Sequence, residues 1–276
     1  MELDPTGLDA LLEHEPGDLV CTVEAGIRLS TLQQALAPHG QRLALDPPGD
    51  PTIGACIAAA LAGPLRHRFG SPRDLVLGVT LVLADGTVAN AGGKVVKNVA
   101  GYDLGKLVCG SRGALALIAR VSLRLHPVPA ATATLVALGD PLRVVAALLD
   151  SQLEPSALDV LHPGRTAILV EGSQRAVEAQ LAEARRLLER VGARVERDEA
   201  VWDESRARQA ASAGTLRFAP SSLAGVLAAE REAVVRPAVG VAHVPGAVEA
   251  APGRGVLRLR EAVRHAFDPT GTLVAC

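Results

Sequence analysis

The clearest periodic pattern of apolar positions lies in the second half of the chain, over residues 173–193. Apolar residues recur there every three or four positions, at Val177, Leu181, Ala184, Leu188 and Val191. This spacing places them on one side of a helix, and Ser173 stands where a capping side chain is expected. The segment therefore predicts an amphipathic helix.

Shorter apolar segments around it predict an alternation of strands and helices. Strands are expected at 132–139 and within ALDVLH, TAILVEG, GTLRFAP and AVGVAHVPG. Helices are expected at 141–152, where Pro141 suits the first turn, in VWDESRARQAA, and at 255–267. Such an alternation is typical of an α/β layer, so this half is predicted to form a small α/β domain.

The first half is predicted to be a mixed sheet with flanking helices. Its clearest element is a hairpin over 74–93, because Asp85-Gly86 supplies the positive φ that a tight hairpin turn requires. The other expected elements are a strand at 18–26, a helix at 29–40, small-residue helical turns at 56–63, a short helix within YDLGKLVCGSRG and a strand or strand pair at 114–129. Pro127 and Pro129 end the last of these. We therefore expect one domain over 1–129 and a second over 130–276.

Composition narrows the class of protein. Hydrophobic residues make up 49% of the 276 residues but aromatic residues only 2%, so Leu, Val, Ile and Ala must fill the core. A net charge of -2 gives no reason to expect nucleic acid or an anionic membrane as partner. The longest apolar run, near TIGACIAAALAGPL, is shorter than the roughly 20 residues that a membrane span needs. No membrane span is predicted.

The cysteines and the first residues indicate a compartment. The four cysteines lie far apart and form no CxxC pair, which argues against disulfides and against an iron–sulfur or zinc site in this chain. The first residues are acidic and contain no secretory apolar segment. We expect a cytoplasmic protein that could be peripheral to the inner membrane through its partners.

Motif searches find no common catalytic or nucleotide-binding signature. GxGxxG after a first strand, GxxxxGK[ST], HExxH and GxSxG are all missing, and the seven histidines never stand at metal-ligand spacing. No metal site is predicted. The catalytic residues stay unknown, and the histidine and arginine constellation that a hydroxy acid would need is not evident after residue 130.

One stretch has an unusual composition. Residues 94–115 contain Tyr102, the only tyrosine, and all three lysines, Lys94, Lys97 and Lys106. Glycines at nearby element junctions would expose backbone N–H groups to a ligand. A structural explanation stays open: the glycines serve turns, Tyr102 fills a gap at a helix start, and the lysines are solvated.

Residues 48–86 and 94–129 resemble the FAD-linked oxidases with the vanillyl-alcohol-oxidase type, or PCMH type, of FAD-binding domain. KNVAGYDL followed by GxxGxL is most similar to the branch that contains the FAD-binding E subunit of glycolate oxidase. The resemblance covers residues 18–129 strongly and returns at 259–273. It implies FAD as the cofactor.

The resemblance also implies where FAD would be held. TIGA is similar to the loop along the flavin and pyrophosphate, AGPLRHRFGS to the stretch that passes the isoalloxazine ring, and GALALIARVSL to a strand that borders the cofactor. NVAGYDL is similar to residues near the flavin pocket. The implied cofactor-binding residues are Thr52, Ile53, Gly54, Ala55, Gly63, Phe69, Gly70, Ser71, Gly101, Tyr102, Leu117 and Ile118.

The chain departs from the family pattern in two places. The family's Gly-rich loop for the FAD pyrophosphate is not found ahead of the first strand. Family TIGG and GTLG are TIGA and GALA here, so Ala55 and Ala116 each add a methyl group. The expected fold is therefore α+β, with an N-terminally truncated vanillyl-alcohol-oxidase-type FAD domain followed by a smaller α/β cap domain.

Three functions follow as hypotheses. The first is the FAD-binding subunit of a glycolate oxidase complex, which oxidises glycolate to glyoxylate and works with a related large FAD subunit and an iron–sulfur subunit. The second is a non-catalytic scaffold subunit that has lost FAD. The third is a stand-alone FAD-linked 2-hydroxy-acid dehydrogenase of the lactate type.

Overall fold

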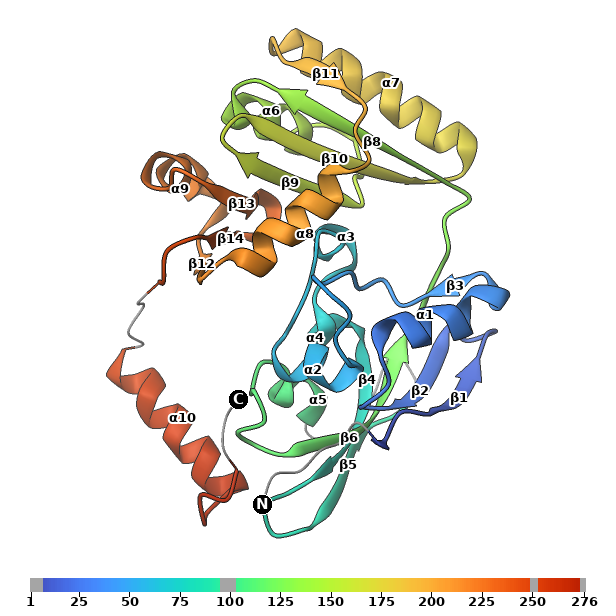
Figure 1. Ribbon diagram of the computed structural model, residues 1–276, viewed down its shortest axis with the longest axis vertical. Helices are drawn as coiled ribbons and strands as arrows, with labels where there is room; N and C mark the ends of the chain where they lie inside the picture. The colour runs from blue at the N-terminus through green and yellow to red at the C-terminus, as the bar shows by residue number, and fades with distance from the viewer. Residues whose placement is uncertain (1–6, 95–102, 249–252, 274–276) are drawn as a thin grey trace. The chain divides into compact units, whose positions relative to one another are not determined.

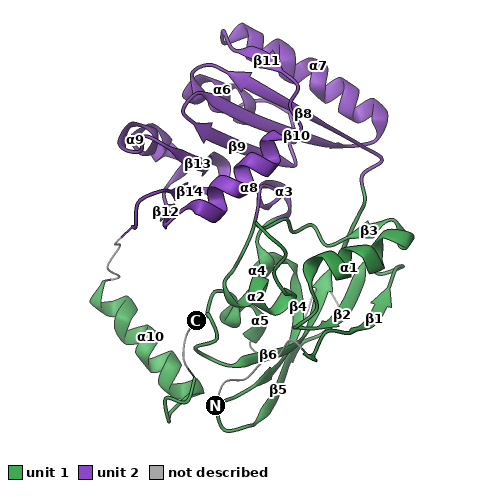
Figure 2. Ribbon diagram, in the orientation of Figure 1, with its two compact units in different colours: residues 1–62, 70–128, 250–276 green, residues 63–69, 129–249 purple. Residues whose placement is uncertain are grey.

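The computed structural model describes residues 7–94, 103–248 and 253–273, and the chain divides into two compact units (Figures 1 and 2). Unit 1 comprises residues 1–62, 70–128 and 250–276, and unit 2 comprises residues 63–69 and 129–249. A single boundary after residue 129 would place residues 63–69 in the first unit and residues 250–276 in the second. Each of these segments instead belongs to the opposite unit. Residues 63–69 fall there because their helix α3 (Arg66–Phe69) packs on a strand of unit 2.

Unit 1 is built on a five-stranded antiparallel sheet with strand order β1-β2-β6-β4-β5. The strands are β1 (Leu11–Glu15), β2 (Val20–Glu24), β4 (Val76–Val82), β5 (Val88–Gly92) and β6 (Leu117–Arg124). The helices are α1 (Leu29–Leu36), η2 (Ala37–His39), α2 (Ile53–Ala58), α4 (Pro72–Leu75), α5 (Leu104–Val108) and α10 (Arg254–Phe267). A two-stranded sheet joins β3 (Gln41–Arg42) to β7 (His126–Pro127).

The core of unit 1 lies on one face of this sheet. Alternate strand residues such as Val23, Val121 and Leu81 are buried there against Leu32 of α1 and Ile57 of α2. Most of the residues between them on β2, β6 and β4 are less buried, and they include the polar side chains of Thr22, Thr80 and Ser122. One face packed and one face polar is the usual state of an antiparallel sheet.

The predicted hairpin is confirmed. β4 and β5 pair in antiparallel register, Gly86 at the turn has φ 85°, and the Thr87 amide donates to Asp85 Oδ1 at 2.9 Å. Strand β4 of this hairpin begins at Val76 and not at residue 74, because residues 72–75 form the short helix α4, with Ser71 as its N-cap. The predicted helix at 29–40 also ends as expected, since Gly40 has φ 64°.

Unit 2 is built on a seven-stranded sheet with order β11-β8-β10-β9-β13-β14-β12. The strands are β8 (Ala131–Leu138), β9 (Ala157–His162), β10 (Arg165–Gly172), β11 (Arg194–Glu196), β12 (Gly214–Arg217), β13 (Ala233–Arg236) and β14 (Val241–Val244). The helices, besides α3, are α6 (Pro141–Leu149), α7 (Gln174–Arg190), α8 (Val201–Ala211), η3 (Pro220–Ser222), α9 (Leu223–Ala229) and η4 (Pro237–Val239). Helices α6, α7 and α9 share apolar clusters with one face of the sheet, and α8 shares a cluster with the other.

The long amphipathic helix is confirmed as α7. Ser173 caps it, with its Oγ accepting the Ala176 amide at 3.3 Å, and Val177, Ala184 and Leu188 are buried. Strand β13 was not predicted, because its four residues AVVR are all buried and therefore show no alternation of apolar and polar positions. Within the described ranges, no helix is long and apolar enough to cross a membrane.

Candidate functional site

Six of the implied FAD-binding residues lie on neighbouring segments of unit 1. Thr52 is the N-cap of α2, with Oγ1 accepting the Ala55 amide at 3.2 Å. The Gly54 amide donates to the Ala25 carbonyl at 2.7 Å, and the Ala25 amide donates to the Ala119 carbonyl at 2.9 Å. The start of α2 is therefore tied through one residue to the start of β6, where Leu117 and Ile118 lie. We call residues 25–27, 52–60 and 109–119 the α2 junction.

A side chain at position 54 would be tightly confined. A Cβ atom there would lie 3.0 Å from both the Cβ and the carbonyl oxygen of Ala25. The close approach of these two backbones fixes where α2 begins. The adjoining Ala55 is exposed, so its additional methyl group meets no packing constraint within unit 1.

The loop before β6 is strained where it meets α2. The Gly110 amide donates to the Ile57 carbonyl at 3.0 Å, and the Arg112 amide donates to the Ala58 carbonyl at 2.8 Å. Both Ala60 (φ 53°) and Arg112 (φ 52°) adopt the left-handed region, which residues with a Cβ atom rarely occupy. Such strain persists where the surroundings enforce it, and it is found preferentially at functional sites.

Ser111 lies in the same loop. Its Oγ is buried and has no hydrogen-bond partner among the described residues. A buried hydroxyl without a partner costs free energy, and a ligand or a water molecule at this position would complete the hydrogen bond. Ser111 and Arg112 were not among the implied site residues. Their position between Gly110 and Gly113 was the one feature of the sequence that could have indicated a binding loop here.

The remaining implied residues do not join this cluster in unit 1. Gly63 and Phe69 belong to the segment of unit 2 that carries α3. Gly70 (φ 81°) and Ser71 precede α4, where the Ser71 amide and Oγ both donate to Asp74 Oδ2, at 2.8 and 2.9 Å. Gly101 and Tyr102 lie outside the described residues.

Unit 2 contains a buried polar network that the sequence did not reveal. Arg236 on β13 and Asp159 on β9 are 1% and 0% exposed, and Arg236 Nε donates to Asp159 Oδ1 at 3.3 Å. Arg236 also donates to Gln209 Oε1 at 2.7 Å, and Ser205 Oγ donates to Asp159 Oδ2 at 2.6 Å. The network links the middle of the sheet to α8.

His243 completes the network in a fixed protonation state. Arg236 Nη1 lies 3.0 Å from His243 Nε2, and a guanidinium can only donate, so Nε2 must be the unprotonated acceptor. Burial, followed by the charges of Arg236 and Arg66, lowers the pKa of His243 to about 4. His243 is therefore neutral at pH 7, and its basic nitrogen is already bound to Arg236. It is poorly placed to act as a general base.

His67 on α3 lies against the same network. The pKa of His67 is lowered overall. Burial is the main cause and the charge of Arg68 adds to it, while the charge of Asp159 opposes both. Its Nδ1 is buried and has no partner among the described residues. Arginine and histidine side chains thus come together in unit 2. Sequence spacing could not predict this, because the residues stand on the separate elements α3, β13 and β14. In the described part of the chain, no group of three or more His, Cys, Asp and Glu side chains could hold a metal ion.

The low pKa of His243 predicts that unit 2 loses stability in mild acid. The unfolded state binds a proton near pH 6.5 and the folded state only near pH 4, so stability falls as the pH drops between these values. The His243→Gln variant, whose amide oxygen can still accept from Arg236, should show a shallower fall. Urea unfolding at several pH values, followed by the fluorescence of Trp202 in unit 2, measures both slopes. Equal slopes would contradict the assignment.

Comparison with known proteins relates the chain to FAD-binding proteins. The family described as FAD binding domain matches residues 2–92. Glycolate oxidase subunit GlcE of Escherichia coli is 35% identical over 61% of this chain and 50% of its own length, and glycolate oxidase subunit GlcD of Bacillus subtilis is 31% identical over 69% and 42%. Mitochondrial D-lactate dehydrogenase [cytochrome] 1 of Saccharomyces cerevisiae is 30% identical over 56% and 27%. The chain thus spans half or less of the length of these curated relatives.

Solved structures give the fold. Alkyldihydroxyacetonephosphate synthase superposes on 96% of this chain and 66% of its own, with a TM-score of 0.71 and 15% identity. A carbohydrate oxidase from Microdochium nivale covers 69% of this chain and 42% of its own, with a TM-score of 0.54 and 22% identity. The α+β fold class and the resemblance to FAD-linked oxidases of the glycolate oxidase type are confirmed. FAD is confirmed as the cofactor of the matched domain.

Proposed function

We propose that the chain is the FAD-binding subunit of a glycolate oxidase complex that converts a 2-hydroxy acid, glycolate, into the 2-oxo acid glyoxylate. The main structural observation in favour of FAD binding is the buried Ser111 Oγ, which has no hydrogen-bond partner among the described residues and lies at the strained α2 junction. When bound, FAD would accept a hydride from the α-carbon of the substrate and hand the electrons on to an iron–sulfur partner subunit.

Residues of the α2 junction would hold the cofactor mainly through the backbone. Thr52 to Ala55 would border it at the start of α2, and Leu117 and Ile118 at the start of β6. Ser111 would contribute a side-chain hydroxyl.

The partners are proposed from the relatives. Two of them are by name subunits of glycolate oxidase, GlcE and GlcD. We propose a related large FAD subunit and an iron–sulfur subunit as partners of this chain, and a cytoplasmic location with membrane association only through them. The general base is not assigned to this chain, since the neutral His243 is already bound to Arg236.

The direct test co-expresses the chain with the candidate partners and measures glycolate-dependent dye reduction. The proposal expects activity from the complex that is lost when this chain is omitted and restored when it is added back. If the complex without this chain turns over glycolate equally well, the proposal is wrong. Full activity from a complex whose copy of this chain holds no FAD would favour the scaffold alternative.

A stand-alone 2-hydroxy-acid dehydrogenase is the second candidate, because D-lactate dehydrogenases of Saccharomyces cerevisiae and Archaeoglobus fulgidus are among the relatives. It predicts that the isolated chain with FAD reduces a dye with D-lactate. The subunit proposal predicts no such turnover without partners.

Replacing Ser111 with alanine should change stability and cofactor affinity in opposite directions. Without cofactor, removal of an unpartnered buried hydroxyl should leave unit 1 equally stable or up to about 1 kcal/mol more stable. With FAD the lost hydrogen bond should weaken binding by about threefold to tenfold. Thermal unfolding with and without FAD, together with a fluorescence titration of FAD, measures both effects. Unchanged FAD affinity would remove Ser111 from the site.

A further inference from the structure

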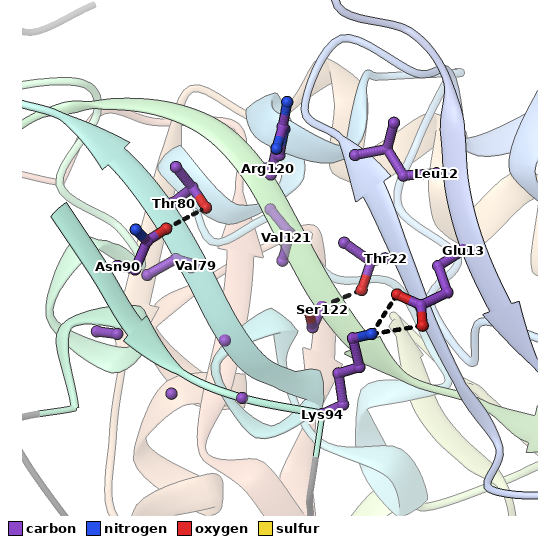
Figure 3. Close-up of a pocket in the computed structure, with 14 residues that line it drawn as sticks. Leu12, Glu13, Thr22, Val79, Thr80, Asn90, Lys94, Arg120, Val121 and Ser122 are labelled. Atoms are coloured by element: carbon purple, nitrogen blue, oxygen red, sulfur yellow. Dashed lines mark hydrogen bonds and ion pairs between the residues drawn. The ribbon is translucent and has the colours of Figure 1, made fainter. Parts of the chain in front are cut away.

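The polar face of the unit 1 sheet is hollowed (Figure 3). The hollow has a volume of about 470 Å³ and extends over residues of all five strands. None of the implied FAD-binding residues lines it. Its size falls in the range of small-molecule sites in proteins.

Three glycines create the depression. Gly78 on β4 pairs with Gly92 on β5, and Gly92 has φ 78°. A Cβ atom on Gly92 would lie 2.2 Å from the Leu77 carbonyl oxygen, and one on Gly78 would lie 2.8 Å from the Gly93 amide nitrogen. Side chains are therefore excluded at these positions by the neighbouring backbone. The sheet surface there is left bare.

Hydrogen-bonding side chains stand around this bare patch. Thr80 Oγ1 donates to Asn90 Oδ1 at 2.7 Å, which leaves the Asn90 amide donors available. Thr22 Oγ1 and Ser122 Oγ lie 2.9 Å apart and form a second pair on the adjoining strands. Both pairs offer polar groups to a ligand without needing to rearrange.

The charges at the hollow leave one cation without a counter-charge. Lys94 forms an ion pair with Glu13 of β1 (Figure 3). Arg120 lies opposite Glu24 in the β2–β6 register, but Glu24 Oε2 accepts the Ala10 amide at 3.1 Å instead. Arg120 makes no ion pair with any described residue. With Lys94 and Glu13 cancelling, the residues that line the hollow carry a net positive charge, and Glu24 lies at its margin.

We propose that this hollow binds a small organic oxyanion, with its carboxylate or phosphate group on Arg120 and its polar remainder on the Thr80–Asn90 and Thr22–Ser122 pairs. A guanidinium presents a planar fork of donors that matches either oxyanion. This site is separate from the α2 junction. It does not depend on the proposed function, so it is tested independently.

Calorimetric titration of the full chain with FAD present tests the site with three probes. Glycerol 3-phosphate carries a phosphate, succinate carries carboxylates without a 2-hydroxyl group, and glycerol carries no charge. Binding of one or both anions, and not of glycerol, is expected. If only glycerol 3-phosphate binds, the site takes a phosphate group; if only succinate binds, it takes a carboxylate group. The absence of binding by both anions up to about 10 mM would overturn the proposal, as would equal binding of glycerol.

Two variants and one control locate the binding. Arg120→Gln should weaken anion binding about tenfold or more, because a charge-assisted bond is lost. Ser122→Leu should weaken it by filling the hollow. Arg124→Gln changes an exposed arginine on the same strand that does not line the hollow, and it should leave the affinity within about twofold. Equal losses from Arg120→Gln and Arg124→Gln would show general charge attraction and overturn the site.

Discussion

Replacing Arg236 with alanine is expected to lower the free energy of unfolding of unit 2 by about 3–5 kcal/mol. The change leaves the carboxylate of Asp159 buried without the Arg236 charge, with the Ser205 hydroxyl still donating to it, and it removes one hydrogen-bond contact each from Gln209 and His243. A buried charge without its partner is among the most destabilising defects in a protein. Trp202 is the only tryptophan, is 7% exposed and donates to Thr134 Oγ1 at 2.9 Å, so its fluorescence reports the unfolding of this unit.

Two further variants give this prediction its controls. Arg143→Ala removes an exposed arginine of unit 2 that pairs with Asp140 on the surface, and it should change stability by less than about 0.5 kcal/mol. Replacing both Arg236 and Asp159 with apolar residues of similar volume should cost much less than Arg236→Ala alone, because no charge is left unpaired. If Arg236→Ala and Arg143→Ala behaved alike, the network would have no structural role.

Replacing Gly54 with valine is expected to abolish FAD binding to unit 1. The new Cβ would lie 3.0 Å from the Ala25 carbonyl oxygen, and the two methyl groups beyond it need more room still. Either α2 shifts away from Ala25 or the end of β2 moves, and each separates Thr52 to Ala55 from the start of β6. The strain should also cost about 1–3 kcal/mol of stability. FAD titration followed by flavin fluorescence measures the loss.

Ala35→Val is the matched control for this change. Ala35 is exposed on α1 of unit 1 and lies outside the α2 junction, so the added methyl groups meet solvent. This variant should bind FAD with unchanged affinity and unfold at nearly the same temperature. If Gly54→Val bound FAD as tightly as the parent chain while staying folded, the α2 junction would not be the cofactor site.

Local patterns predicted most of the secondary structure, because they depend on neighbours in sequence. The 3.6-residue period of α7 and the Asp85-Gly86 turn both correspond to observed elements. Strands β1 and β13 were not predicted, for opposite reasons. β1 is a half-exposed edge strand with charged residues, and β13 is four buried residues long. Neither carries the alternation that identifies a strand.

The candidate sites were harder to predict, because they depend on which segments meet in space. The resemblance indicated Thr52 to Ala55 and Leu117 to Ile118, which lie in one junction of unit 1. Ser111 gained its significance only from burial without a partner. The network around Arg236 draws on residues from β9, α8, β13 and β14, between 159 and 243 in the chain. No sequence spacing links such distant positions.

The measurement that tests the central claim most directly is the flavin content of the purified chain after incubation with excess FAD and removal of the unbound cofactor. The visible absorbance of flavin, compared with the protein concentration, gives the stoichiometry. The account predicts close to one FAD per chain for the parent protein and a clearly lower occupancy for Ser111→Ala under the same washing. A parent chain that retains no flavin would contradict an FAD site at the α2 junction.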